Sequence, residues 1–273
     1  MRAWMNGSLL SDASAAAISV VDHGFTVGDG VFEAIKVLDG EPFGLTRHLE
    51  RLDKSARAMG LPEVDEALVR EGVRAVLACE RLALGRLRIT YTAGPAPLGS
   101  GRGNSSPTLV VAAAGMDPWP LTTAIVTVPW PRNERGAVAG LKTTSYAENV
   151  IALATAAEQG ASEAIFANTV GQLCEGTGSN VFYVVAGEVR TPTLASGCLA
   201  GVTRALIIEW FEAREVDEPI AIAEMADEVF LASTTRDVQG VHRWNSRSLH
   251  APGPITAAIR ARWAVKERES LDP

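Results

Sequence analysis

Residues 1–115 combine strand-like and helix-like spacing of hydrophobic positions. Asn-Gly at 6–7 and Asp-Gly at 39–40 are turn signals that join short β-rich runs, as in hairpins. Apolar residues three or four apart predict a helix that Thr46 caps and that Gly60 and Pro62 end. The expected elements are a hairpin over 4–10, strands over 31–37, 88–92 and 108–113, and helices over 46–59 and 66–79. This half therefore predicts a strand-rich α+β domain.

Residues 116–120 interrupt this pattern, because two prolines within three residues make a stiff connector. We place a linker there, between a small domain over 1–115 and a larger domain over 121–273. Strand-like and helix-like segments alternate in the second half, which is typical of an α/β arrangement. The expected elements are strands over 125–128, 164–167, 181–186 and 228–232, and helices over 147–159, 203–211 and 254–266. The glycine-rich stretch 99–106 is predicted to be a flexible loop that can lie over a site.

Composition narrows the classes of function. The chain has 273 residues, of which 47% are hydrophobic, and a net charge of −7. This charge argues against a nucleic-acid-binding surface, but a few arginines can still make a local pocket for a small anion. Three cysteines without a CxxC pair predict neither a disulfide framework nor a zinc ribbon. The start of the chain lacks signal-peptide features, and no apolar run is long enough to span a membrane, so we expect a soluble, cytoplasmic protein.

Three segments could serve one ligand. Lys142 follows an apolar, glycine-containing stretch, and burial there would free its lone pair for attack on an aldehyde. Glu175 precedes Gly176 and Gly178, so the backbone can fold closely around a planar ring whose nitrogen the carboxylate keeps protonated. The stretch 201–203, Gly-Val-Thr, opens a helix whose free N–H groups suit a phosphate. Pyridoxal phosphate carries the three matching groups: an aldehyde, a ring nitrogen and a phosphate.

Other candidates are weaker when each is taken alone. Thr234 and Thr235 follow a predicted strand and offer hydroxyl and backbone donors, whereas Arg51 lies on a helix face opposite its leucine stripe. Each of these residues also fits an ordinary surface role. His23 and His48 lack the spacing of metal ligands, and we predict no metal site. Complete dinucleotide-binding, phosphate-loop and nucleophile-elbow motifs are absent from the sequence.

Taken together, the motifs resemble those of the class IV, fold-type IV pyridoxal-phosphate enzymes. The resemblance covers essentially the whole chain and includes the segments 22–33 and 47–52 besides those around Lys142, Glu175 and 201–203. The family includes branched-chain aminotransferases, D-amino acid aminotransferases and 4-amino-4-deoxychorismate lyases. It implies a small N-terminal α+β domain and a larger C-terminal α/β domain, with pyridoxal 5'-phosphate in the cleft. Family members are usually homodimers with active sites at the interface.

The resemblance also implies residue roles. Lys142 matches the Schiff-base lysine that shuttles a proton, and Glu175 matches the acid paired with the pyridinium nitrogen. Tyr146 resembles the tyrosine beside the cofactor's phenolic oxygen, and Thr235 aligns with a position whose backbone helps to hold the substrate carboxylate. The positions that match phosphate-holding residues are Arg51, Val202, Thr203 and Thr234.

Three further residues are candidates for substrate binding. Arg88 lies on a predicted strand at a position often used to hold a substrate carboxylate, and Arg102 lies on the glycine-rich loop, from which it could reach a partner subunit's site. Phe25 stands where the D-amino acid enzymes carry a tyrosine.

The branch within the family stays open at this stage. The four-residue spacing from Lys142 to Tyr146 resembles the lyase and D-amino acid branches, but Ala34 stands where many lyases carry a threonine. A methyl group cannot donate a hydrogen bond or relay a proton. We therefore expect an aminotransferase that acts on an amine and a 2-oxo acid. The alternatives are an aminodeoxychorismate lyase that eliminates pyruvate, and a cofactor-binding protein without turnover.

Overall fold

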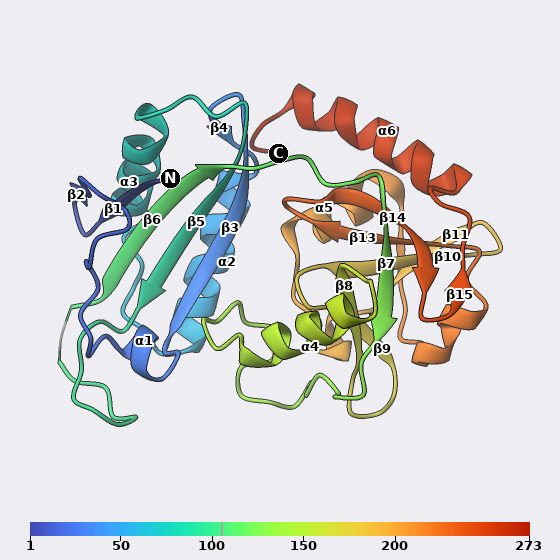
Figure 1. Cartoon of the computed structure of the whole chain (residues 1–273), viewed down its shortest axis with the longest axis horizontal. Helices are drawn as coiled ribbons and strands as arrows, with labels where there is room; N and C mark the ends of the chain where they lie inside the picture. Colours follow the sequence, from blue (N-terminus) through green and yellow to red (C-terminus); the bar gives the residue numbers. More distant parts are fainter. Residues whose placement is uncertain (105) are drawn as a thin grey trace. The chain divides into compact units, whose positions relative to one another are not determined.

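The computed structural model describes residues 1–104 and 106–273, so Ser105 of the predicted flexible loop lies outside the described residues. The chain divides into two compact units (Figure 1). The first unit comprises Met1–Pro118, Leu141–Tyr146 and Ser270–Pro273, and the second comprises Trp119–Gly140 and Ala147–Glu269. Two short segments beyond the predicted linker thus belong to the first unit. One of them contains Lys142.

The first unit is built on an antiparallel sheet with the strand order β2-β1-β6-β5-β3-β4 (Figure 1). Its strands are β1 (Arg2–Met5), β2 (Ser8–Leu9), β3 (Gly30–Leu38), β4 (Glu41–Pro42), β5 (Leu84–Thr92) and β6 (Thr108–Gly115). Its helices are α1 (His23–Thr26), α2 (Leu45–Ala58) and α3 (Glu66–Ala78). The turn glycines adopt the left-handed backbone that the hairpins require, with φ of 97° at Gly7 and 93° at Gly40. Both predicted hairpins are therefore confirmed.

Helix α2 packs its predicted leucine stripe into the core of the first unit. Leu49, Leu52 and Ala56 are buried against Val73 of α3 and Ile35 of β3. The prediction that Thr46 caps this helix is wrong. Gly44 is the N-cap residue, and the Thr46 hydroxyl instead donates a 2.6 Å hydrogen bond to Asp272. The side-chain carboxylate of Asp272, which is 226 residues away in the sequence, takes the hydrogen bond of the threonine, so the local sequence could not indicate it.

The second unit contains a mixed sheet of nine described strands in the order β12-β11-β10-β13-β14-β7-β8-β9, with β15 paired to β14 (Figure 1). The strands are β7 (Thr122–Thr127), β8 (Glu163–Ala167), β9 (Leu173–Gly176), β10 (Asn180–Val185), β11 (Glu188–Thr191), β12 (Arg214–Glu215), β13 (Glu228–Ser233), β14 (Asp237–Trp244) and β15 (Arg247–Ser248). The helices are α4 (Ala147–Glu158), α5 (Val202–Phe211) and α6 (Pro254–Glu269), with short 3-10 turns η1 (Leu194–Ser196) and η2 (Ile220–Glu224). Strand β7 pairs in parallel with both β14 and β8.

Both faces of this sheet are covered. Val126 of β7 packs with Ala152 and Ala156 of α4, whereas its neighbour Ile125 belongs to a separate cluster that contains Ile222 of η2. Successive side chains of a strand point to opposite faces, so the two clusters lie on opposite sides. None of the described helices is long and apolar enough to cross a bilayer.

Candidate active site

The segment Leu141–Tyr146 lies along the exposed edge of β3 at its N-terminal end. The Phe32 N–H donates to the Lys142 carbonyl at 3.0 Å, and the Thr144 N–H donates to the Gly30 carbonyl at 2.8 Å. Strand β4 pairs only with the far end of β3, at Val37 and Leu38. The edge beside residues 30–32 is thus available to this segment, which fixes the backbone of Lys142.

The Lys142 side chain lies among aromatic rings and is half-buried. Its Nζ is 4.4 Å from the ring centroid of Phe32 and 5.8 Å from that of Tyr146. The two rings meet edge to face at 5.3 Å. The Arg88 guanidinium lies 3.9 Å from the Phe32 centroid. The first unit therefore brings three predicted site residues together around one phenylalanine.

Arg51 is held by a buried carboxylate. Its Nε donates to Glu33 Oε1 at 2.8 Å and its Nη2 to Glu33 Oε2 at 2.6 Å, and His48 Nδ1 lies 2.7 Å from the same Oε2. Glu33 is fully buried. Although burial opposes ionisation, the Arg51 charge and hydrogen bonds lower the pKa of Glu33 to about 2. Burial lowers the pKa of His48. Glu33 thus orients a predicted phosphate-holding arginine, a role that the sequence did not reveal.

Glu175 lies on β9, a strand that was not predicted. Its Oε2 accepts a 2.8 Å hydrogen bond from the Leu199 N–H, and its Oε1 lies 3.3 Å from Arg132 Nε. Sequence reasoning noted the run from Arg132 to Lys142 as similar to the lyase branch but gave Arg132 itself no role. Arg132 lies in the loop 128–140, and only folding brings this loop beside β9.

The helix predicted after Gly201 is confirmed as α5. Gly201 is the N-cap residue, and no described side chain caps the helix. A Cβ at Gly201 would lie 2.1 Å from Asn180 Oδ1, so the close approach of these two segments requires glycine. Val202 and Thr203 are buried. A helix start with uncapped N–H groups fits the phosphate of pyridoxal phosphate.

Thr234 and Thr235 lie in the half-buried turn between β13 and β14. The next residue, Arg236, donates to Gln239 at 2.6 Å and lies 3.6 Å from the buried carboxylate of Glu163. Glu163 also accepts hydrogen bonds from the Thr177 N–H at 2.9 Å and from the Ser179 hydroxyl at 2.9 Å. One buried acid thus connects the 234–235 turn to the glycine turn after Glu175. Sequence reasoning missed it as well.

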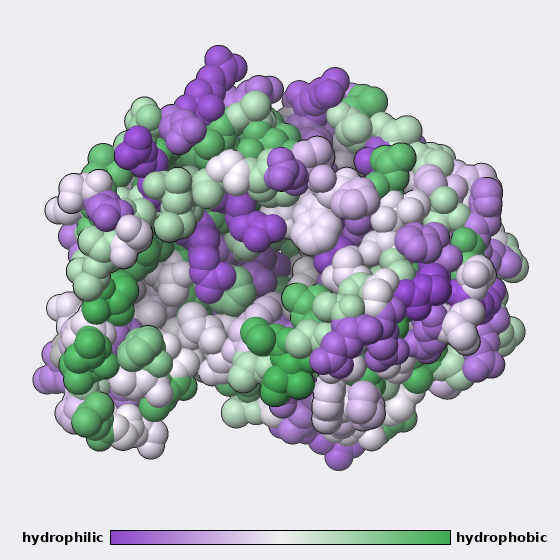
Figure 2. All heavy atoms as spheres, viewed as in Figure 1, coloured by the Kyte–Doolittle hydropathy of each residue, from purple (hydrophilic) through white to green (hydrophobic). Residues whose placement is uncertain are grey.

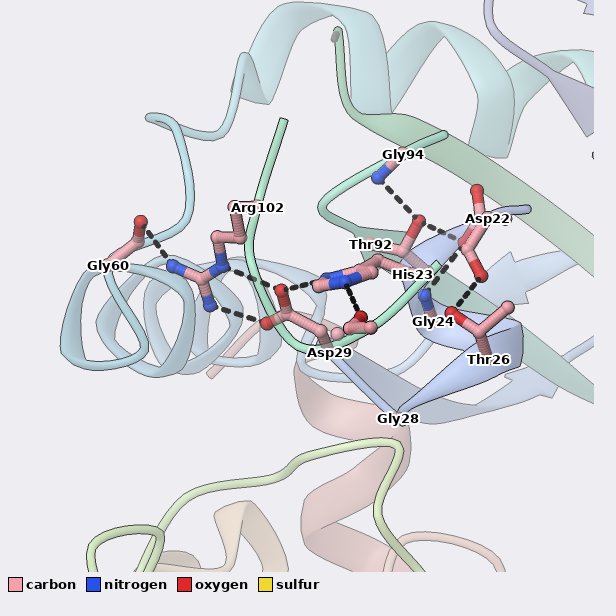
Figure 3. A network of polar contacts seen from close by, with 12 residues as sticks. Asp22, His23, Gly24, Thr26, Gly28, Asp29, Gly60, Thr92, Gly94 and Arg102 are labelled. Carbon is pink, nitrogen blue, oxygen red and sulfur yellow. Dashed lines mark hydrogen bonds and ion pairs between the residues drawn. The ribbon is translucent and has the colours of Figure 1, made fainter. Parts of the chain in front are cut away.

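Two predicted substrate-binding residues, Phe25 and Arg102, have no described contact with the residues around Lys142. Phe25 lies on α1 and is 74% exposed. Arg102 forms a two-pronged ion pair with Asp29, with its Nε 2.6 Å from Oδ2, and its Nη1 donates to the Gly60 carbonyl at 2.8 Å (Figure 3). In this structure Arg102 anchors its own loop. A role for either residue in substrate binding stays a prediction.

His23 completes this network. Its Nδ1 lies 2.9 Å from Asp29 Oδ2 (Figure 3). Its Nε2 lies 2.9 Å from the Gly99 carbonyl. Both partners are acceptors, so only a doubly protonated imidazolium can donate to both. The hydrogen bond to Asp29, followed by that to Gly99, raises the pKa of His23 above its ordinary value of 6.5.

We predict that NMR titration of the native protein gives His23 a pKa above 6.5. Because the pKa is higher in the folded state, the contact stabilises the fold fully below the unfolded value and less as pH rises through the folded value. Asp29→Asn should lower the His23 pKa and weaken this pH dependence of stability. A native pKa at or below 6.5 would contradict the network as drawn.

Each unit presents groups of the kinds that pyridoxal phosphate needs: the first has a lysine among aromatic rings, and the second has a strand carboxylate and an uncapped helix start. Comparison with known proteins identifies the family. The profile of the family described as amino-transferase class IV matches residues 30–244. The chain therefore belongs to the class IV aminotransferases. Enzymes of this family use pyridoxal phosphate, and the expected fold-type IV architecture is confirmed.

Relatives come from several branches of the family. A bifunctional aminodeoxychorismate lyase/D-amino acid transaminase of Mycobacterium tuberculosis is 31% identical, over 81% of this chain and 84% of its own length. A D-alanine aminotransferase of Bacillus licheniformis is 28% identical over 95% of each chain. The structure of the branched-chain aminotransferase of Thermoproteus uzoniensis with norvaline superposes with a TM-score of 0.89, at 27% identity, covering 97% of this chain and 93% of that one.

Proposed function

We propose that this enzyme is an aminotransferase that moves an amino group between an amino acid or related amine and a 2-oxo acid, with Lys142 as its catalytic lysine. The observation that carries the proposal is the placement of the Lys142 amine against Phe32 and Tyr146. Lys142 is half-buried, and partial removal of its amine from water favours the neutral, nucleophilic form. The membership in class IV supports the same chemistry.

Each site residue has a proposed task. Pyridoxal phosphate, when bound, supplies an aldehyde that takes up amines and a ring that accepts electrons. Lys142 removes the proton from the substrate Cα and returns it as a general acid. Glu175 would hold a proton on the ring nitrogen, and Tyr146 would interact with the phenolic oxygen. The residues proposed to hold the phosphate are Arg51, Val202, Thr203 and Thr234.

The lyase alternative rests on the relatives. An aminodeoxychorismate lyase of Bacillus subtilis is 30% identical over 76% of this chain, and the Mycobacterium tuberculosis relative combines both activities. Against it, Ala34 is paired with Arg88 across β3 and β5, where it offers no hydroxyl to relay a proton. This departure favours the aminotransferase.

Two incubations distinguish the activities. The holoenzyme is given amino acids, of both configurations at Cα, together with 2-oxoglutarate, and separately aminodeoxychorismate with no 2-oxo acid. We expect a new amino acid in the first mixture. Pyruvate and p-aminobenzoate formed rapidly in the second, with no amino transfer in the first, would reverse the assignment. A cofactor absorption band that ignores every amine would indicate a binding protein without turnover.

Arg88 is proposed to hold the substrate carboxylate. Its guanidinium shares the Phe32 ring with the Lys142 amine, so a bound carboxylate there would present the neighbouring Cα to the lysine. Arg88→Met should raise KM for the amino acid about tenfold or more while kcat changes less. Steady-state kinetics on the variant check this expectation. Arg74→Met, on the exposed face of α3, is the control. An unchanged KM would remove Arg88 from the substrate site.

We further propose that the enzyme is a homodimer with active sites at the interface. Hydrophobic residues gather over α4 on the face shown in Figure 2, where Val150 and Ile151 are 64% and 55% exposed. An apolar group of this kind commonly marks a protein interface. Sedimentation should give twice the mass of the chain. A monomer at every concentration would contradict the proposal.

A further inference from the structure

We infer that Arg132 is a positioning residue that keeps the Glu175 carboxylate ionised and correctly oriented for the cofactor's ring nitrogen. The inference rests on the proposed function and adds the means by which the Glu175 charge is maintained. Arg132 would act through Glu175 and would not itself touch the ring.

The first observation is that a nitrogen atom approaches each carboxylate oxygen of Glu175. One carboxylate oxygen accepts from the Leu199 N–H at 2.8 Å, and the other lies 3.3 Å from Arg132 Nε. A carboxylate with a donor or a cation at each oxygen has a restricted rotation about its last bond. The two contacts also stabilise its negative charge.

The second observation is how firmly Arg132 itself is held. Its guanidinium stacks over Phe166 with Cζ 4.2 Å from the ring centroid, and its Nη1 donates to Asn149 Oδ1 at 2.9 Å. The Asn149 amide donates in turn to the Thr177 carbonyl at 2.7 Å. The Arg132 side chain is 17% exposed. A buried strand, a helix and the glycine turn therefore all fix the guanidinium.

The third observation concerns the Nε atom that faces Glu175. This atom is buried, and no hydrogen-bond acceptor meets it among the described residues, although the Glu175 oxygen is close enough for an ion pair. A buried arginine nitrogen without an aligned acceptor is costly. This placement is explained if Arg132 acts on Glu175 through its positive charge and not through an aligned hydrogen bond.

The negative charge of Glu175 decides where the proton of the ring nitrogen lies. The proton shared between a carboxylate and a pyridine nitrogen stays on the nitrogen only while the carboxylate is the weaker base. A nearby guanidinium makes the carboxylate a weaker base, and Arg remains charged at every relevant pH. With Arg132 present, Glu175 would therefore stay ionised, and bind the protonated ring, down to a lower pH.

The experiment measures cofactor binding rather than turnover. Apoprotein is titrated with pyridoxal phosphate from pH 5 to 8, and Kd is followed by absorbance. The variants are Arg132→Met, Arg132→Lys, Glu175→Gln and the double variant Arg132→Met/Glu175→Gln. Arg135→Met is the matched control, because Arg135 lies on the same loop but its side chain is 78% exposed and pairs with Glu134.

We expect Arg132→Met to weaken cofactor binding about tenfold at low pH and to move the acid-side rise in Kd upwards by about one pH unit. Arg132→Lys should recover part of this loss, because it restores charge but not planar stacking. Adding Arg132→Met to Glu175→Gln should change nothing further, because the residue through which Arg132 acts is already neutral. Arg135→Met should bind as the wild type does.

Three outcomes would overturn the inference. They are a Kd profile for Arg132→Met equal to that of the wild type, additive losses in the double variant, and equal losses in Arg132→Met and Arg132→Lys accompanied by altered circular dichroism. The last result would mean that the arginine is merely structural. If wild-type apoprotein fails to bind pyridoxal phosphate at any pH, the proposed function itself fails.

Discussion

Lys142→Ala is expected to lower kcat for amino transfer by about a thousandfold or more, the largest functional effect we predict. General acid–base catalysis by one positioned side chain contributes about 10²- to 10⁴-fold, and Lys142 is proposed to provide covalent anchoring as well. The loss should be specific to chemistry. Lys142 is half-buried and its backbone pairs with β3 through atoms that alanine retains, so the fold should survive.

Two measurements check this expectation. Borohydride reduction of the wild-type holoenzyme, followed by peptide mass spectrometry, should place the cofactor mass on the peptide that contains Lys142. The variant should show no such adduct. Lys54→Ala is the control, because Lys54 is exposed on α2. An adduct on a different lysine, or a variant that turns over within tenfold of the wild type, would refute the role.

The elements that sequence spacing predicted best are those whose pattern is strictly local. The leucine stripe of α2 is read from residues three or four apart, and the Asn6-Gly7 turn from two adjacent residues. Strand β14 was missed because Asp237, Gly240 and His242 interrupt any apolar run. It is a strand because β13 and β7 hydrogen-bond to it on both sides. Such pairing depends on residues far away in the sequence.

In the candidate site, too, local motifs were predicted and long-range contacts were not. Lys142 and Glu175 stand in recognisable motifs, and family resemblance alone was enough to propose their roles. The residues that hold the site are different. Arg132 and Glu163 each lie well outside the motif they support, and their roles depend on distances that only the folded chain sets. Arg102 was expected near substrate because of its loop, but its nearest partner is the Asp29 carboxylate.

A common arrangement connects these supporting residues. Three of the predicted cofactor-binding segments have a buried ionic partner: Glu33 holds Arg51, Arg132 faces Glu175, and Glu163 lies beside Arg236 in the turn of Thr234. Buried charges of this kind are weak as general stabilisers, because removing them from water is costly. They are well suited to fixing the direction of a side chain that must meet a charged ligand. Removing one partner should therefore affect stability and cofactor binding together.

Glu33→Gln is expected to destabilise the protein by about 3 to 5 kcal/mol, the largest effect on stability that we predict. The carboxylate is fully buried and receives two hydrogen bonds from Arg51, so the variant removes a negative charge from beside a largely buried guanidinium. A glutamine side chain has the same size but offers a single acceptor oxygen and no charge. Cofactor affinity should fall as well, because Arg51 loses the group that orients it.

The pH dependence distinguishes a lost charge from a lost contact. The pKa of Glu33 is lowered from 4.5 to about 2, so its ionised form stabilises the fold fully above 4.5 and progressively less as pH falls towards 2. Urea unfolding should show a constant gap between wild type and Glu33→Gln above pH 5 and a narrowing gap below it. Glu50→Gln, exposed on the same helix that carries Arg51, should leave stability within about 0.5 kcal/mol. A gap that stays constant down to pH 3 would mean that the pKa of Glu33 is not lowered in the folded protein, which would contradict its charge pairing with Arg51.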